Sequence, residues 1–248
     1  MADQSHIRTI NIGPHEWVRA DFDLFKTGVA PSPEELQSWF DPNDHYAEAS
    51  PVGVGGRSAA WFVRVRQLQA VLRHYRRGGW AAKLLRTDYV WTGLTKTRAF
   101  AEFELLGQMH RAGLPVPQPI AARVYKRGFL YEAALLMVRI PDAQPLAQIV
   151  DPQVWAQAGR EIARMHAFGV WHADLNVYNI MSGQDGSVWL IDFDRSRDGG
   201  VAEGLRTENL SRLLRSIRKI VPEQEHSGWP ALSRAYQHAW LGFTEHME

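Results

Sequence analysis

One stretch of the chain, residues 172–194, places polar side chains at a spacing that suits chemistry on phosphate groups. Asp174 lies in the loop 172–179, Asn179 follows five residues later, and Asp192 comes thirteen residues after Asn179, at the end of the apolar run 188–191. A loop carboxylate can orient an acceptor hydroxyl, while an amide and a second carboxylate are hard oxygen ligands that hold Mg²⁺ against nucleotide phosphates. These residues therefore predict phosphoryl transfer, with Asp174 as the catalytic group and Asn179 and Asp192 as metal ligands.

The order of these residues also matches a sequence signature. His172-Ala173-Asp174, Asn179 and Asp192-Phe193 follow the His-x-Asp, Asn, Asp-Phe-Gly pattern of phosphotransferases. The alternative is that these residues only cap turns, as Asp and Asn often do, but the combined spacing favours the catalytic interpretation. His172 needs no role in proton transfer, and a buried histidine that braces the loop is the simpler assignment.

The elements that must position these residues form a strand-rich half and a helical half. Before the loop, β-type runs at 59–65, 69–76, 121–125 and 130–138 flank a helical pattern at 97–110, in the order ββαββ. The segment 141–145 contains two prolines, interrupts the apolar pattern and indicates a linker. Beyond it, helices are expected at 154–168, 206–220 and 230–243, with a short strand at 188–191.

This pattern predicts an α+β fold in three segments. Residues 1–50, which contain Pro31, Pro33 and Pro42, are expected to form an irregular N-terminal extension. Residues 51–140 form the strand-rich half and residues 141–248 the helical half that carries the loop and the Asp192 strand. A small antiparallel sheet with one main helix is thus followed by a short helical lobe.

Composition excludes several functional classes. The 248 residues include 28 Lys and Arg against 27 Asp and Glu, a formal charge of +1 that gives no reason to expect nucleic acid as a partner. Without cysteine there are no disulfides, thiolate metal sites or cysteine nucleophiles. The N-terminus lacks a signal-peptide pattern and no apolar run reaches spanning length, so we expect a chain that neither crosses a membrane nor follows the usual export route.

The chain resembles the protein-kinase-like superfamily and, within it, the bacterial lipopolysaccharide kinases, with most likeness to those that phosphorylate 3-deoxy-D-manno-octulosonic acid (Kdo). The resemblance covers about residues 50–220 and is carried by the segments 71–79, 92–103, 114–117, 172–176, 189–195 and 209–216. It implies a two-lobed protein-kinase-like fold. Residues 51–140 would be the N-lobe that binds nucleotide phosphates, and residues 141–248 the C-lobe with the catalytic loop, the metal site and the acceptor site.

The resemblance also assigns residues to the nucleotide phosphates. Where such kinases carry a phosphate-binding lysine in the second strand, this sequence has Arg73, and Lys83 is the alternative. Glu102, on the predicted helix 97–110, would pair with the cation, although a solvated helix face is the competing interpretation. Gly53, Gly55 and Gly56 lie where a loop would cover the phosphates of ATP, and a plain hairpin turn is their alternative.

The sequence departs from the kinase pattern after Asp192. Asp194 replaces the glycine of Asp-Phe-Gly, and is either a further metal ligand or a surface carboxylate. Only 56 residues follow Asp192 and they contain no Ala-Pro-Glu motif, so a protein substrate is not expected. Between residues 64 and 86 lie five arginines besides Arg73, together with Lys83, and no acidic residue; this suits an anionic membrane surface, with solvated strand edges as the alternative.

The resemblance implies an ATP- and Mg²⁺-dependent sugar kinase. Its acceptor would be the 4-hydroxyl of Kdo on a Kdo-lipid A precursor, in lipopolysaccharide core biosynthesis, with the enzyme bound peripherally at the cytoplasmic face of the bacterial inner membrane. One alternative is a phosphotransferase for aminoglycoside- or choline-type acceptors, although such cations would favour an acidic cleft. Another is a pseudokinase that acts as a binding module.

Overall fold

The computed structural model describes residues 6–25, 30–45, 50–51, 60–75 and 89–245. The chain divides into two compact units, the first made of residues 1–104 and 118–139 and the second of 105–117 and 140–248. The main transition between them, at Arg139 and Ile140, lies next to the linker predicted at 141–145. Among the described residues, no helix combines the length and the apolar character needed to cross a membrane.

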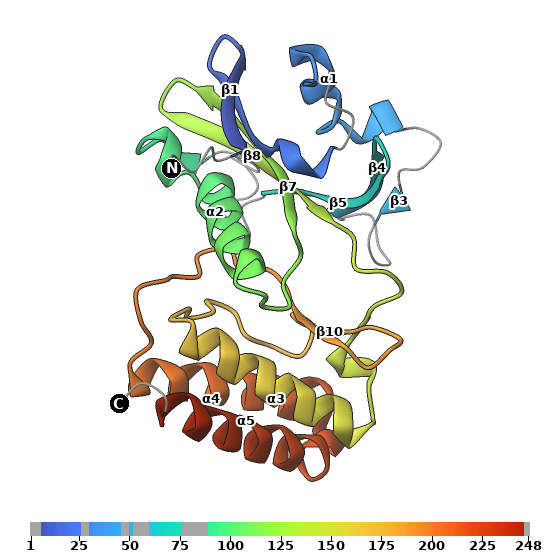
Figure 1. Cartoon of the computed structure of the whole chain (residues 1–248), viewed down its shortest axis with the longest axis vertical. Coiled ribbons are helices and arrows are strands. Elements are labelled where there is room, and N and C mark those ends of the chain that lie inside the picture. The colour runs from blue at the N-terminus through green and yellow to red at the C-terminus, as the bar shows by residue number, and fades with distance from the viewer. Residues whose placement is uncertain (1–5, 26–29, 46–49, 52–59, 76–88, 246–248) are drawn as a thin grey trace. The chain divides into compact units, whose positions relative to one another are not determined.

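The first unit is built on an antiparallel sheet (Figure 1). Along the sheet, the strands are β1 (Ile7–Gly13), β2 (Glu16–Asp21), β7 (Pro119–Arg127), β8 (Leu130–Val138), β5 (Leu68–His74), β4 (Ala60–Val65) and β3 (Ser50–Pro51), and β6 (Tyr89–Val90) also pairs with β8. Buried side chains from β2, β5 and β8, such as Val18, Leu72 and Leu136, form a core. Leu36 of helix α1 (Pro33–Ser38) and Phe40, which follows this helix, belong to the same core. The predicted strand positions in 59–138 and the helix between them are confirmed.

The prediction of irregular structure for residues 1–50 is wrong. Strands β1 and β2 form a hairpin, and β2 pairs with β7 in the middle of the chain. Val18 and Ala20 in β2 are buried, but the third buried position of the alternation is Glu16, which pairs with Arg123 of β7. Because one of the three buried positions is charged, the sequence of β2 lacks the alternation of apolar and polar residues from which a strand is predicted.

Two of the prolines in this region, Pro33 and Pro42, start helical turns instead of breaking regular structure. Pro33 is the first residue of α1 (Pro33–Ser38), where the missing N–H costs no hydrogen bond. Ser32 caps this helix, because its side chain accepts a hydrogen bond from the backbone N–H of Glu35 at 3.2 Å. Pro42 similarly begins a 3₁₀ turn, Pro42–His45.

Helix α2 (Arg98–Arg111) supplies residues to both units, with Arg98–Glu104 in the first and Leu105–Arg111 in the second. Its apolar side chains Phe100, Phe103, Leu106 and Met109 are buried, as their helical spacing predicts. The helix is followed by Gly113, whose φ of +75° suits a residue without a Cβ.

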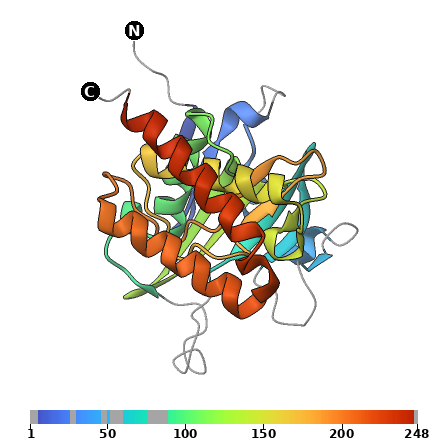
Figure 2. The ribbon, with the colours of Figure 1, turned by 90° about the horizontal axis from the view of Figure 1, so that it is seen from below.

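The second unit is dominated by three helices, α3 (Pro152–Ala167), α4 (Glu203–Ile220) and α5 (Gly228–Thr244), which match the three predicted ones. Figure 2 shows α4 in orange and α5 in red. Helices α3 and α5 pack closely at Gly159, where an added Cβ would lie 2.1 Å from the carbonyl oxygen of Leu232. A small sheet of β9 (Gln144–Pro145), β10 (Ile180–Ser182) and β11 (Val188–Leu190) completes the unit and brackets the polar loop.

Candidate active site

His172 braces the loop 172–179 from inside the second unit. The residue is fully buried, and its Nε2 donates to the carbonyl oxygen of Ile191 at 3.0 Å. A carbonyl oxygen only accepts, so the proton of the neutral ring is on Nε2. The unprotonated Nδ1 therefore accepts from the backbone N–H of Asp174 at 3.1 Å. Burial lowers the pKa of His172, which keeps the ring neutral. His172 therefore joins the loop to the end of the β11 region, as a brace and not as a proton carrier.

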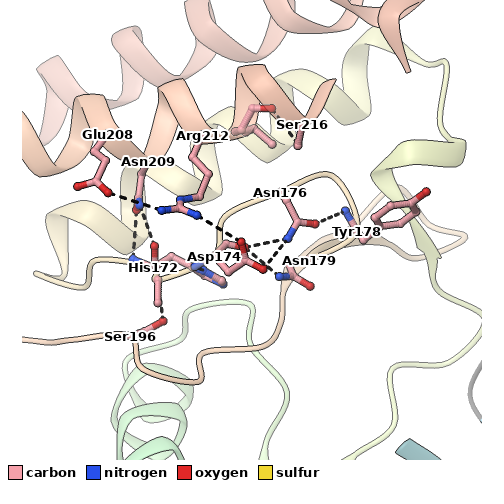
Figure 3. A network of polar contacts seen from close by, with 12 residues as sticks. His172, Asp174, Asn176, Tyr178, Asn179, Ser196, Glu208, Asn209, Arg212 and Ser216 are labelled. Atoms are coloured by element: carbon pink, nitrogen blue, oxygen red, sulfur yellow. Dashed lines mark hydrogen bonds and ion pairs between the residues drawn. The ribbon is translucent and has the colours of Figure 1, made fainter. Parts of the chain in front are cut away.

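Asp174 presents its carboxylate from a backbone that two amides hold in place (Figure 3). Its side chain is 63% exposed. Asn176 Nδ2 donates to the carbonyl oxygen of Asp174 at 3.0 Å and to its Oδ2 at 3.2 Å, and Asn179 Nδ2 donates to the same carbonyl at 2.9 Å. The carboxylate is thus oriented and accessible, which is the geometry that an acceptor hydroxyl requires.

Asn179 and Asp192 approach one another through the main chain. The backbone N–H of Ile191, the residue before Asp192, donates to the carbonyl oxygen of Asn179 at 3.0 Å. Asn179 uses its Nδ2 on Asp174, so the oxygen of the same amide is the atom that a cation would contact. The described residues contain no group of three histidine or acidic side chains that could by itself hold a metal ion. One amide oxygen and one carboxylate still fit Mg²⁺, which takes most of its other ligands from water and substrate phosphates.

The backbone of Asp192 has a φ of +62°, in the left-handed region that aspartate tolerates better than most residues. The neighbouring Ile191 is fixed on both sides, by Asn179 at its N–H and by His172 at its carbonyl. Such a conformation persists when surrounding contacts determine it, and it is frequent at functional sites. Asp194, two residues on, is partly buried.

Helix α4 holds the loop at both ends through side chains whose roles the sequence did not reveal. Asn209, fully buried, accepts from the backbone N–H of His172 at 3.1 Å and donates to its carbonyl oxygen at 2.8 Å. At the other end, Ser216 Oγ accepts from the backbone N–H of Val177 at 3.1 Å and donates to Leu213 O at 2.9 Å. The seven-residue separation of Asn209 and Ser216 is the only signal that both lie on one helix face. Figure 3 shows Asn209 beside His172, and Ser216 farther along the same helix.

The Asn209 amide is also tied to helices α3 and α5. His166 Nε2 lies 3.1 Å from Asn209 Oδ1, and His166 Nδ1 lies 2.9 Å from the hydroxyl of Tyr236. Asn209 Oδ1 accepts from the backbone N–H of His172, which identifies this atom as the amide oxygen. An amide oxygen only accepts, so His166 Nε2 donates to it, and His166 Nδ1 is left to accept from the hydroxyl of Tyr236. Burial lowers the pKa of His166 from 6.5 to about 4, so the ring is neutral at pH 7.

Acid should destabilise the fold through His166. The pKa is about 4 in the folded chain and 6.5 as its ordinary value, so unfolding takes up a proton as the pH falls below 6.5. The sign is therefore a loss of stability with falling pH, down to the folded pKa. Between pH 7 and pH 5 this group should lower the free energy of unfolding by about 2 kcal/mol, measured by urea denaturation.

The matched control is His166→Gln, whose amide can donate to Asn209 and accept from Tyr236 without titrating. This variant should lose about 2 kcal/mol less than the wild type over the same pH interval. Equal losses in the two proteins would show that His166 does not carry the acid dependence.

In the first unit, the structure brings Arg73 and Glu102 together. Arg73 on β5 and Glu102 on α2 form an ion pair, and Glu102 is only 2% exposed, so the solvated-face interpretation of this residue is wrong. The hydroxyl of Tyr75 donates to Glu102 Oε2 at 2.5 Å. Burial and the Glu102 charge raise the pKa of Tyr75 well above 10, which keeps it a donor. The other predicted phosphate-binding residues, Lys83, Gly53, Gly55 and Gly56, lie outside the described residues.

Comparison with known proteins identifies relatives over most of the chain. Residues 45–236 match the model of the lipopolysaccharide kinase (Kdo/WaaP) family. The 3-deoxy-D-manno-octulosonic acid kinase of Stenotrophomonas maltophilia (strain K279a) is 44% identical over 209 residues, which are 81% of this chain and 84% of that protein. The protein of the same name from Xylella fastidiosa (strain M23) is 44% identical over 200 residues, 77% of this chain and 80% of that protein.

Among solved structures, a glucosamine kinase (crystal form A) superposes with a TM-score of 0.52 at 12% identity, covering 97% of this chain and 80% of that chain. At this identity the likeness concerns the fold, and it confirms the predicted kinase-like fold class. The family match covers well over half of the residues, and it includes Asp174 and Asn179 in the loop as well as Asp192. The chain is therefore a phosphotransferase that belongs to the lipopolysaccharide kinase (Kdo/WaaP) family.

Proposed function

We propose that this chain transfers the γ-phosphoryl group of ATP to the 4-hydroxyl of Kdo on a Kdo-lipid A precursor. The observation that carries the proposal is the arrangement of the loop. Asn176 and Asn179 orient Asp174 by hydrogen bonds, and the carbonyl oxygen of Asn179 accepts from the N–H of the residue before Asp192. The relatives named as Kdo kinases support the choice of acceptor.

In this proposal, Asp174 accepts a hydrogen bond from the acceptor hydroxyl. The hydroxyl oxygen forms a bond to the γ-phosphorus, the bond from that phosphorus to the β,γ-bridging oxygen breaks, ADP leaves, and the hydroxyl proton passes to Asp174. Asn179 and Asp192 would hold Mg²⁺, which neutralises charge on the nucleotide phosphates when bound. The exposure of the Asp174 carboxylate, against the burial of His172, makes Asp174 the residue that can meet the acceptor.

The proposal assigns Arg73 to the nucleotide phosphates and Glu102 to the orientation of Arg73. The Arg73 guanidinium bonds Glu102 and Tyr75 and lies over the Tyr75 ring, 4.9 Å from its centroid. These contacts fix the orientation of the guanidinium, which preorganises it for an anion. Lys83 stays the alternative for the same role, and Gly53, Gly55 and Gly56 stay the predicted phosphate loop.

The choice between acceptor classes follows from the charge next to the catalytic group. Arg212 lies 3.6 Å from Asp174. A cationic aminoglycoside or choline-type acceptor would meet a like charge there, whereas an anionic sugar acid would meet an opposite one. The site therefore favours the sugar acid.

A direct assay tests the proposed function. The full chain, with labelled ATP and Mg²⁺, is given a Kdo-lipid A precursor, the same lipid without Kdo, or kanamycin. We expect label only on the Kdo-containing lipid, and no transfer when EDTA removes Mg²⁺. Label on kanamycin would establish the aminoglycoside alternative. Binding of ATP without transfer to any acceptor would establish the pseudokinase alternative.

We also propose peripheral association with the cytoplasmic face of the bacterial inner membrane. The support is the run of basic residues between 64 and 86 without acidic ones, of which residues 76–86 lie outside the described part of the chain. Each basic residue near an anionic surface contributes about 1 kcal/mol, so a few together give reversible adsorption. The protein should co-sediment with anionic vesicles at low salt, and Arg76, Arg77, Lys83 and Arg86 changed to Ser should weaken this. Equal sedimentation of the quadruple variant would remove the segment from this role.

A further inference from the structure

Helix α4 brings a cation to the catalytic group. Arg212 Nη1 lies 3.6 Å from Asp174 Oδ1, and Arg212 Nη2 lies 3.7 Å from Glu208 Oε1 one turn earlier on the helix (Figure 3). Its side chain is 37% exposed, so the guanidinium lies at the surface beside the Asp174 carboxylate. The function proposed above uses Arg212 only as a positive charge beside Asp174 and assigns its guanidinium no contact with the acceptor.

The place of Arg212 is set by other residues. Asn209 and Ser216 fix α4 to the two ends of the loop, at His172 and at Val177, and Arg212 lies between them in the helix. The loop is therefore held without help from Arg212. An ion pair with both side chains partly exposed contributes little to stability, so a purely structural role explains the position poorly.

The guanidinium retains donor capacity. Both of its carboxylate contacts are longer than the usual limit of about 3.2 Å for an N–H to O hydrogen bond. Its Nε is buried and has no hydrogen-bond partner among the residues that the structure describes. An arginine has five N–H donors in a planar fork that matches a carboxylate with two parallel bonds. Arg212 is thus a preplaced and underused carboxylate-binding group next to the catalytic aspartate.

We propose that Arg212 binds the carboxylate of the sugar-acid acceptor and thereby determines the acceptor specificity of the enzyme. This inference rests on the proposed function, since Kdo is a sugar acid. Its carboxyl group and its 4-hydroxyl are borne by ring carbons with one carbon between them. When Arg212 holds the carboxylate, the hydroxyl is directed to the neighbouring Asp174. The positive charge also offsets the repulsion between Asp174 and an anionic acceptor.

The test compares two acceptors and three proteins. The acceptors are a Kdo-lipid A precursor and the same compound with the Kdo carboxylate converted to its primary amide. The proteins are the wild type, Arg212→Gln, and Arg215→Gln as a control that removes an exposed arginine from the same helix. The readouts are kcat/KM for each acceptor and KM for ATP.

We expect the wild type and Arg215→Gln to prefer the carboxylate by about 10- to 100-fold, the strength of a hydrogen-bonded charge pair. Arg212→Gln should lose this preference through a higher KM for the acid, with KM for ATP unchanged. Arg212→Lys keeps the positive charge but not the two parallel N–H donors, so it should retain part of the preference for the carboxylate. The amide acceptor with wild-type protein reports on the same preference without any substitution.

The outcomes separate this inference from the function on which it rests. If the wild type phosphorylates the acid and the amide equally well, or if Arg212→Gln keeps the preference, Arg212 does not read the carboxylate and the proposed function stands. A higher KM for ATP with an intact preference would assign Arg212 to the nucleotide and overturn the inference. If the wild type phosphorylates neither Kdo compound, the proposed function and this inference fail together.

Discussion

Replacing Asp174 with asparagine is expected to lower kcat by about 10²- to 10⁴-fold, the usual contribution of a positioned acid or base. The affinity for Mg²⁺-ATP should stay within about twofold of the wild type, because Asp174 acts on the acceptor and not on the bound nucleotide. Turnover of labelled ATP onto the acceptor measures the first quantity, and calorimetry of Mg²⁺-ATP binding measures the second.

The Asp174→Asn substitution preserves the local hydrogen bonds of the loop. Asn176 donates to one carboxylate oxygen, and an asparagine oxygen can accept the same bond. The remaining contacts with Asn176 and Asn179 involve the carbonyl oxygen of residue 174, which the substitution keeps. Asp185→Asn is the matched control, since Asp185 is an exposed aspartate in the turn between β10 and β11. Retention of more than about a tenth of the wild-type kcat by Asp174→Asn would remove Asp174 from its proposed role.

Replacing Arg73 with alanine should destabilise the fold by about 3–5 kcal/mol, because it removes one partner of an ion pair whose other partner, the Glu102 carboxylate, is buried. Glu102→Ala should also destabilise, and both variants should use ATP poorly. The double variant should be scarcely worse than either single one, since both changes remove the same ion pair. Urea denaturation and KM for ATP are the measurements.

A second ion pair in the same unit serves as the control. Arg127 and Glu132 approach to 3.1 Å, but the Arg127 side chain is 61% exposed. Arg127→Ala should therefore cost no more than about 1 kcal/mol. If Arg73→Ala leaves the use of ATP unchanged while Lys83→Ala abolishes it, the pair of Arg73 and Glu102 is structural and Lys83 holds the nucleotide.

The parts of the site that the sequence predicts are those with local spacing. Asp174, Asn179 and Asp192 lie within 19 residues of one another and form a recognisable order, and hydrogen bonds join Asn179 to Asp174 and to the residue before Asp192. Asn209 and Ser216 act through contacts with residues 37 and 39 positions earlier in the chain. Such pairs depend on how α4 packs, which periodicity in the helix does not specify. The segment 209–216 carries part of the family resemblance, but the role of its side chains follows only from the tertiary contacts.

The strands missed near the N-terminus have a different cause. Strand β2 pairs with β7, more than 100 residues later, and one of its buried positions holds Glu16, whose carboxylate forms an ion pair with Arg123 of β7. A charged residue that is buried because its partner comes from a distant strand looks like a surface residue in the sequence. Glu102 is the same case on a helix, since it is buried and its carboxylate contacts Arg73 and Tyr75, which lie about 30 residues earlier in the chain.

The way in which the catalytic loop is held has a consequence for redesign. Asn209 bonds the N–H and the carbonyl of His172, Ser196 accepts from the N–H of Ala173 at 3.1 Å, and Ser216 accepts from the N–H of Val177. All of these partners are main-chain atoms, which every residue except proline offers in the same form. The contacts from α4 and from Ser196 thus depend on the path of the loop, whereas the side chains of His172, Asn176 and Asn179 also hold it and must be kept. Loop side chains that face the acceptor can be exchanged, or a loop of equal length grafted from a relative, while the scaffold that holds the loop stays unchanged.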